Sequence, residues 1–130
     1  MIIDTSALVA ILEREPEGAR FRELLRGADS VSISAGTMLE AAIVLDSRDP
    51  TKTSRLLDAL VEALGVQIVP VDEQQVRVAR AAYRDFGRGS SHPAQLNFGD
   101  CFAYALATIT REPLLFKGDD FGHTDVLPAA

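Results

Sequence analysis

Two patterns of apolar residues follow one another along the chain. One consists of short runs that are wholly apolar or that alternate apolar and polar residues, and the other of longer stretches with the spacing of an amphipathic helix. The short runs predict strands, and stretches with apolar residues three and four apart predict helices. The predicted strands are residues 1–3, Ser30–Ser34, Val66–Val71 and Pro113–Phe116, with a further short strand at VLP near the end of the chain. The predicted helices are residues 4–15, Glu17–Ala28, Ala35–Ser47, Thr51–Leu64, Glu73–Phe86 and Gly99–Thr110.

The order of these elements predicts an α/β fold. Strands that alternate with helices, and that are apolar enough to be buried on both faces, are typical of a three-layer sandwich in which helices flank a mostly parallel sheet. Pro70 places its strand at an end or edge of the sheet, because proline cannot donate a hydrogen bond to a neighbouring strand. The Gly87–Leu96 loop is too short to separate domains, so residues 1–130 are predicted to form a single domain.

Composition and charge narrow the class of protein. The chain is 47% hydrophobic and 25% charged, as globular domains are, and no apolar run is as long as a membrane span. The single Cys101 excludes an internal disulfide, and MIID meets an acid too early for a signal peptide, so we expect a cytoplasmic protein with no membrane partner. The net charge of −6 argues against broad electrostatic binding to nucleic acid, although four arginines recur at helical spacing in residues 77–88.

Asp4, Glu40 and Asp100 are each the only charged residue in a long apolar stretch. The three stretches are Met1–Leu12, Ala35–Leu45 and Pro93–Thr110. A carboxylate in apolar surroundings is costly unless a cation, a metal or hydrogen-bond donors compensate its charge. Three such acids, far apart in sequence, predict a fold that brings carboxylates together around a divalent metal ion.

The predicted strands place these acids near one edge of the sheet. Asp4 directly follows the first strand, Glu40 lies in the second turn of the helix after the second strand, and Asp119 and Asp120 follow the fourth. Asp100 opens the helix that precedes the fourth strand. Sites in parallel sheets form beyond the carboxyl ends of the strands, so we expect several of these acids to face one crevice. Ligation by oxygen alone favours Mg²⁺ or Mn²⁺ over zinc.

Each acid also has a purely structural interpretation. Asp4, like its neighbours Thr5 and Ser6, is a candidate cap for the first helix, and Asp100 interacts favourably with a helix dipole. The two acids after the fourth strand are ordinary turn residues. Glu40 is the hardest to explain in this way, because it lies inside a helix with no basic residue three or four positions away.

Other reactive side chains give weaker signals. His92 and His123 are too few and too scattered for a zinc motif, and we interpret both as residues of surface loops. Cys101 and Tyr104 lie in an apolar helix and are interpreted as core residues.

Four segments resemble a known family in the right order along essentially the whole chain. IDTSALVAIL, TMLEAAIVL, NFGDCFAYALA and LLFKGDDFGHTD resemble a PIN domain, and most closely the VapC-type ribonuclease toxins of bacterial toxin–antitoxin pairs. The resemblance implies a sheet of about five parallel strands flanked by helices. It also implies Mg²⁺- or Mn²⁺-dependent endonucleolytic cleavage of RNA, often structured RNA such as tRNA.

The resemblance assigns roles to the lone acids. The family's first acid corresponds to Asp4, its second to Glu40 and its third to Asp100, and all three are predicted to be catalytic residues that bind the metal. The small hydroxyl after the first acid corresponds to Thr5 or Ser6, which we expect to support the site.

The fourth acid departs from the family pattern. In many members it falls where this chain has Gly118, with Asp119 next and Asp120 after it. Asp119 is our choice as the fourth catalytic and metal-binding acid, and Asp120 is placed in a supporting role.

The resemblance further implies a homodimer, an RNA substrate and a separate antitoxin, whose Arg or Lys would pair with the acids and displace the metal. Two alternatives come from other classes. A phosphoacceptor receiver domain would use Lys117 and an acid such as Asp72, but it needs a second acid where Thr5 stands, and a haloacid-dehalogenase phosphatase needs an Asp where Ser6 stands. A degenerate PIN scaffold that only binds partners is the third possibility.

Overall fold

The computed structural model describes residues 1–130 and contains a parallel four-stranded sheet with the order β3-β2-β1-β4. The strands are β1 (Ile2–Ile3), β2 (Ser32–Ser34), β3 (Gln67–Val69) and β4 (Leu114–Leu115). Ile2 of β1 is paired with Ser32 of β2 on one side and with Leu114 of β4 on the other. The predicted parallel sheet is therefore confirmed.

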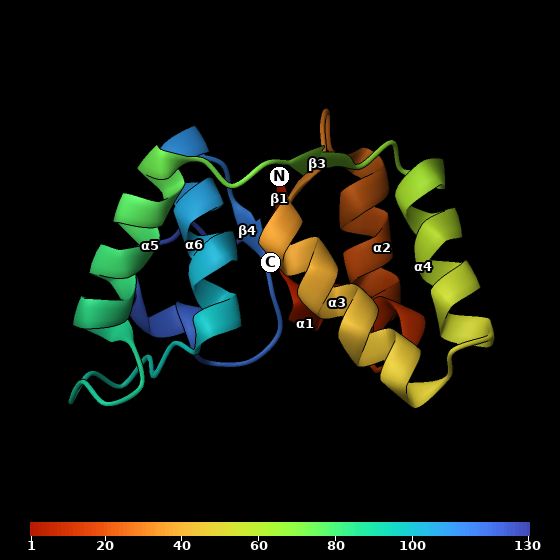
Figure 1. Cartoon of the computed structure of the whole chain (residues 1–130). Coiled ribbons are helices and arrows are strands. Elements are labelled where there is room, and N and C mark those ends of the chain that lie inside the picture. Colours follow the sequence, from red (N-terminus) through yellow and green to blue (C-terminus); the bar gives the residue numbers. More distant parts are fainter.

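Six α-helices and one 3₁₀ helix surround the sheet. They are α1 (Thr5–Leu12), α2 (Gly18–Gly27), α3 (Ala35–Arg48), α4 (Lys52–Ala63), α5 (Glu73–Phe86), α6 (Phe98–Thr110) and η1 (Phe121–His123). Figure 1 shows α5 and α6 together on one side of the sheet, with α1, α2 and α4 on the other. The predicted helices are confirmed, most of them to within one or two residues, but α1 is shorter than residues 4–15 because Arg14 adopts a left-handed conformation with φ of 56°.

Alternate residues of the short strands build two separate cores. Ile3 and Leu115 belong to a core with α1, α2, α3 and α4, whereas Ile2 and Leu114 belong to a core with α6. Because neighbouring residues of a strand face opposite sides of a sheet, two buried residues in each central strand produce a three-layer sandwich. None of the helices is long and apolar enough to cross a membrane.

The edge regions of the sheet differ from the predictions. The expected strand at VLP is reduced to a single bridge between Leu114 and Pro128, so the sheet has four strands and not about five. β3 lies at the edge, as Pro70 predicts, but it is not buried on both faces: Ile68 is 50% exposed. A strand at an edge has a neighbour on one side only, so its apolar residues are covered less completely than those of β1.

Candidate active site

Asp4 connects the end of β1 to the start of α1. It is the N-cap of α1, where its Oδ2 accepts hydrogen bonds from the Ser6 backbone N–H at 2.9 Å and from the Ser6 hydroxyl at 2.7 Å. The side chain is almost fully buried, and its other oxygen, Oδ1, has no hydrogen-bond partner. Burial raises the pKa of Asp4 against the opposing hydrogen bonds from Ser6, and the charge of Glu40 raises it further. The residue is therefore a helix cap with one carboxylate oxygen left over.

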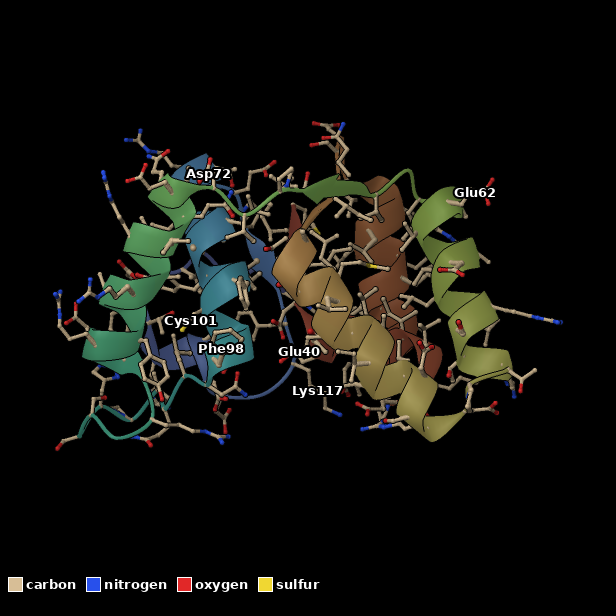
Figure 2. All side chains as sticks on the ribbon, viewed as in Figure 1. Glu40, Glu62, Asp72, Phe98, Cys101 and Lys117 are labelled. Atoms are coloured by element: carbon tan, nitrogen blue, oxygen red, sulfur yellow. The ribbon has the colours of Figure 1, made fainter.

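Glu40 occupies a narrow position where three helices meet. The Thr5 hydroxyl at the start of α1 donates a hydrogen bond of 2.5 Å to Glu40 Oε1. The other carboxylate oxygen lies against the backbone of Gly99 in α6. Figure 2 shows Glu40 on the side of α3 that faces α6. The apolar neighbours that make Glu40 conspicuous in the sequence do not bury it, because Leu39 and Ile43 are themselves about 60% exposed.

Asp100 is held by the first turn of α6. Its Oδ2 accepts the Asn97 backbone N–H at 2.9 Å, and its own N–H donates to Asn97 Oδ1 at 2.9 Å, which together form a capping box. Burial raises the pKa of Asp100 to about 7, and the charges of Asp4, Asp120 and Glu40 contribute to the rise. Asp100 thus lies in the first turn of its helix, where the helix dipole favours a negative charge, while three other acids nearby repel that charge.

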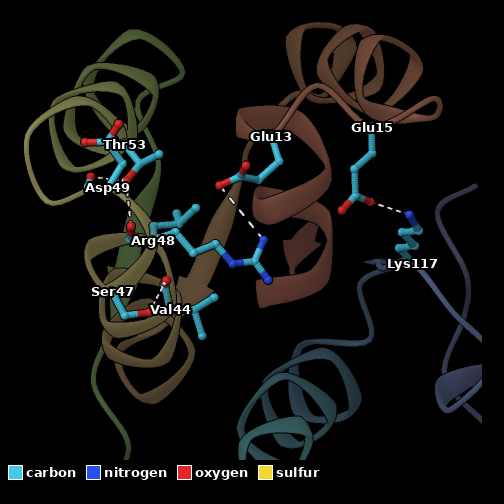
Figure 3. A network of polar contacts seen from close by, with 9 residues as sticks. Glu13, Glu15, Val44, Ser47, Arg48, Asp49, Thr53 and Lys117 are labelled. Carbon is cyan, nitrogen blue, oxygen red and sulfur yellow. Dashed lines mark hydrogen bonds and ion pairs between the residues drawn. The ribbon is translucent and has the colours of Figure 1, made fainter.

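The loop after β4 carries the candidates for the fourth acid and is fastened to α1. Lys117 donates its backbone N–H to the Ser6 hydroxyl at 2.9 Å, and its ammonium group forms ion pairs with Glu15 and Glu17. Figure 3 shows the pair between Lys117 and Glu15. The hydrogen bond to Ser6 holds the loop beside the N-terminus of α1, where Asp4 lies, and the ion pairs join the loop to the segment between α1 and α2.

The two candidates for the fourth acid differ in their relation to Asp100. The charge of Asp120 raises the pKa of Asp100, whereas Asp119 is not among the charges that do so. Asp119 instead contributes to the local turn, where its carbonyl accepts the Gly122 N–H at 3.0 Å. The choice of Asp119 over Asp120 remains a prediction from the resemblance, and the electrostatics of the site favour Asp120.

The acids lie near one another, but each is turned toward a protein donor. Asp4 is bonded to Ser6, Glu40 to Thr5 and Asp100 to Asn97. As they stand, no three His, Cys, Asp or Glu side chains are close enough to share one ion. The donor set nevertheless fits a hard divalent cation: all its atoms are oxygens, one buried oxygen of Asp4 lacks a partner, and the charge of Glu40 adds to the effect of burial in raising the pKa of Asp4 and of Asp100.

Two supporting residues were missed in the sequence. Asn97 precedes Asp100 by three positions, and this N-x-x-D spacing is a recognisable capping signal. Gly99 has no such signal, because its contact with Glu40 exists only once α3 packs against α6.

The remaining reactive residues are structural. Nδ1 of His92 accepts the Ala94 N–H at 3.1 Å, and Tyr104 is a core residue, as predicted, whose hydroxyl donates to Asp125 at 2.6 Å. Cys101 is free and buried, and burial raises its pKa to about 11. A thiol with this pKa is protonated near neutral pH, so Cys101 is not a reactive nucleophile.

Comparison with known proteins identifies the family. The PIN-domain family profile matches residues 1–127. The chain belongs to the PIN-domain family. Ribonuclease VapC28 of Mycobacterium tuberculosis is 56% identical over 97% of this chain and 95% of its own length, and ribonuclease VapC42 of the same species is 50% identical over 99% and 98%. This PIN domain is therefore a VapC-type ribonuclease, and the receiver and phosphatase alternatives do not describe it.

Solved structures show the same PIN fold at lower identity. VapC20 of Mycobacterium tuberculosis, described as a toxin that cleaves the sarcin–ricin loop, superposes with a TM-score of 0.77 at 15% identity over 97% of this chain and 95% of that one. A chain of a toxin–antitoxin complex from Klebsiella pneumoniae gives a TM-score of 0.72 at 18% identity over 99% of this chain and 97% of that one. The predicted fold and family are confirmed.

Proposed function

We propose that Asp4, Glu40 and Asp100, with an acid of the loop after β4, hold Mg²⁺ or Mn²⁺ and that the chain hydrolyses phosphodiester bonds of RNA, such as those of tRNA. The observation that supports this proposal most strongly is the raised pKa of Asp100, of which burial is the largest cause and to which the charges of Asp4, Asp120 and Glu40 add. Such mutual repulsion is unfavourable in the free protein and is relieved when a divalent cation neutralises the carboxylates.

The chain's own residues would act by holding and orienting oxygens. Asp4 contributes the buried Oδ1 that has no partner, while Ser6 keeps Oδ2 fixed. Thr5 orients Glu40, and the capping box orients Asp100. A cation bound there would supply the positive charge that lowers the pKa of an attacking water and offsets the charge of the phosphate.

The partners proposed for this ribonuclease are an antitoxin and a second copy of the chain. One structural neighbour is a chain of a toxin–antitoxin complex, which supports an antitoxin as partner. The carboxylates of the acid cluster could form ion pairs with an Arg or Lys of such a partner. Large exposed apolar side chains on four helices support a homodimer, and light scattering tests it. They are Leu39 and Ile43 of α3, Leu56 of α4, Val76 and Tyr83 of α5, and Phe98 of α6. We place this action in the cytoplasm, in keeping with the free Cys101.

RNA cleavage by the purified chain tests the proposal. We expect cleavage with Mg²⁺ or Mn²⁺, none in EDTA, and none from folded Asp4→Asn or Asp100→Asn protein. Asp58→Asn, which changes an exposed acid of α4, is the matched control and should cleave normally. Cleavage that survives EDTA and both site substitutions would overturn the proposal. It would also exclude the degenerate-scaffold alternative, because a scaffold that only binds partners does not cleave RNA.

A further inference from the structure

The Glu40 carboxylate lies in a space that exists because residue 99 has no side chain. A Cβ placed on Gly99 would be 1.7 Å from Glu40 Oε2 and 2.5 Å from its Cδ, far inside any van der Waals contact. Gly99 is buried in the first turn of α6, and it is not one of the residues with a positive φ. The backbone conformation at this position therefore does not require glycine, and the three atoms nearest to a Cβ there all belong to Glu40.

The second oxygen of the same carboxylate is held by α1. Glu40 Oε1 accepts the Thr5 hydroxyl at 2.5 Å. One oxygen is thus fixed by a side chain of α1, and the other lies against the backbone of α6. We call this arrangement of Thr5, Glu40 and Gly99 the Glu40 clamp.

The clamp orients a long and otherwise flexible side chain toward the other acids. Glutamate loses considerable rotamer freedom when it is ordered, so an ordered glutamate needs contacts that compensate for this loss. In this position its charge raises the pKa of both Asp4 and Asp100. A Glu40 displaced from Gly99 would also lose its geometry relative to Thr5.

We propose that Gly99 is a positioning residue for this ribonuclease: the missing side chain admits the Glu40 carboxylate to the acid cluster. The inference rests on the proposed function in one respect, namely that Glu40 is an acid of the metal site. Because the carboxylate is the far end of a flexible side chain, a methyl group at residue 99 would displace Glu40 and leave the fold intact.

The chain offers a matched control in the same helix interface. A Cβ on Gly36 of α3 would lie 2.5 Å from a ring carbon of Phe102 in α6, so Gly36→Ala also crowds α3 against α6 but meets an aromatic ring and no acid. Comparing the two alanine variants separates the positioning of Glu40 from the general spacing of the two helices.

The first measurement is Mn²⁺ binding to the purified full chain by titration calorimetry. We expect Gly99→Ala to weaken binding roughly 10–100-fold, the range typical of lost support for a metal ligand. Gly36→Ala should lower the Tm and leave the Mn²⁺ affinity unchanged. Gly99→Ala/Glu40→Asp, with a carboxylate one methylene shorter, should bind more tightly than Gly99→Ala alone. Unchanged affinity in Gly99→Ala, or an equal loss in Gly36→Ala, would overturn the proposal.

The second measurement is the Tm in EDTA, which does not depend on metal binding. Alanine is a better helix former than glycine, and in a Glu40→Ala background it would meet no carboxylate. We therefore expect the change in Tm caused by Gly99→Ala to be more favourable in the Glu40→Ala background than in the wild-type chain. An equal change in Tm in both backgrounds would also overturn the clamp. If wild-type protein fails to bind Mn²⁺ while this difference in Tm persists, the proposed function is wrong and the clamp stands.

Discussion

The Ser6 hydroxyl joins Asp4 to the backbone of Lys117. It donates to Asp4 Oδ2 at 2.7 Å and accepts the Lys117 N–H at 2.9 Å, across 111 positions of sequence. A single hydroxyl can do both because it has one donor and two acceptor positions. The first acid and the loop that carries the last one are therefore held in a fixed relation by one atom of α1.

Removing this hydroxyl should damage both the fold and the site. We expect Ser6→Ala to lower the free energy of unfolding by about 1–2 kcal/mol, because Lys117 loses its acceptor and Asp4 keeps only the backbone donor. RNA cleavage should fall by roughly 10–100-fold, as for other losses of support to metal-site residues.

Ser47→Ala is the control for this substitution. The Ser47 hydroxyl is exposed and donates only to the carbonyl of Val44 within α3, as Figure 3 shows. Urea unfolding should place this variant within about 0.5 kcal/mol of wild type, with normal cleavage. Equal stability and equal activity of Ser6→Ala and Ser47→Ala would contradict the role given to Ser6.

The raised pKa of Asp100 predicts a pH dependence of stability in EDTA. The pKa rises from 3.8 to about 7 on folding. Between these values the folded protein holds a proton that the unfolded chain has released, so the contribution of Asp100 to stability falls as the pH rises from about 4 to about 7.

Asp100→Asn cannot ionise and still offers an oxygen to the Asn97 N–H. We expect it to be more stable than wild type by a margin that is small at about pH 4 and larger at about pH 8. Urea unfolding in EDTA at several pH values measures this margin. A margin that does not change with pH would contradict the raised pKa of Asp100, and a variant less stable than wild type throughout would show that the capping role outweighs the repulsion.

The fourth acid can be assigned by comparing Asp119→Ala with Asp120→Ala. Since the charge of Asp120 raises the pKa of Asp100, we expect Asp120→Ala to lower that pKa and to cost more cleavage activity than Asp119→Ala. Carboxyl NMR titration of metal-free protein reports the pKa directly. If only Asp119→Ala impairs cleavage and shifts Asp100, the assignment from the resemblance is correct and the electrostatic one is wrong.

The lone acids were predictable because a single charged residue within an apolar stretch can be recognised from the sequence without the three-dimensional structure. Asp4 and Asp100 justify that reasoning, since burial is the largest cause of each raised pKa. The apolar neighbours that singled out Glu40 cover it only in part, because Leu39 and Ile43 are exposed whereas Ala41 is buried. Its relation to the site comes from Thr5 and so depends on the packing of α3 against α1.

Features that depend on the spacing of packed elements could not be predicted in this way. The contact between Gly99 and Glu40 requires the position of α3 relative to α6, and a glycine without positive φ gives no local signal. The exposure of Ile68 likewise follows from the position of β3 at the edge of the sheet. An apolar run in the sequence does not distinguish an edge strand from a central strand, so this exposure could not be predicted.

The central claim is that these acids hold a divalent cation, and an anomalous difference map from crystals grown with Mn²⁺ tests it most directly. We predict one strong peak bounded by the carboxylates of Asp4, Glu40 and Asp100. Asp4 Oδ1, which has no hydrogen-bond partner within the protein, should be among its ligands. A map with no peak there, at Mn²⁺ concentrations that support RNA cleavage, would contradict the account.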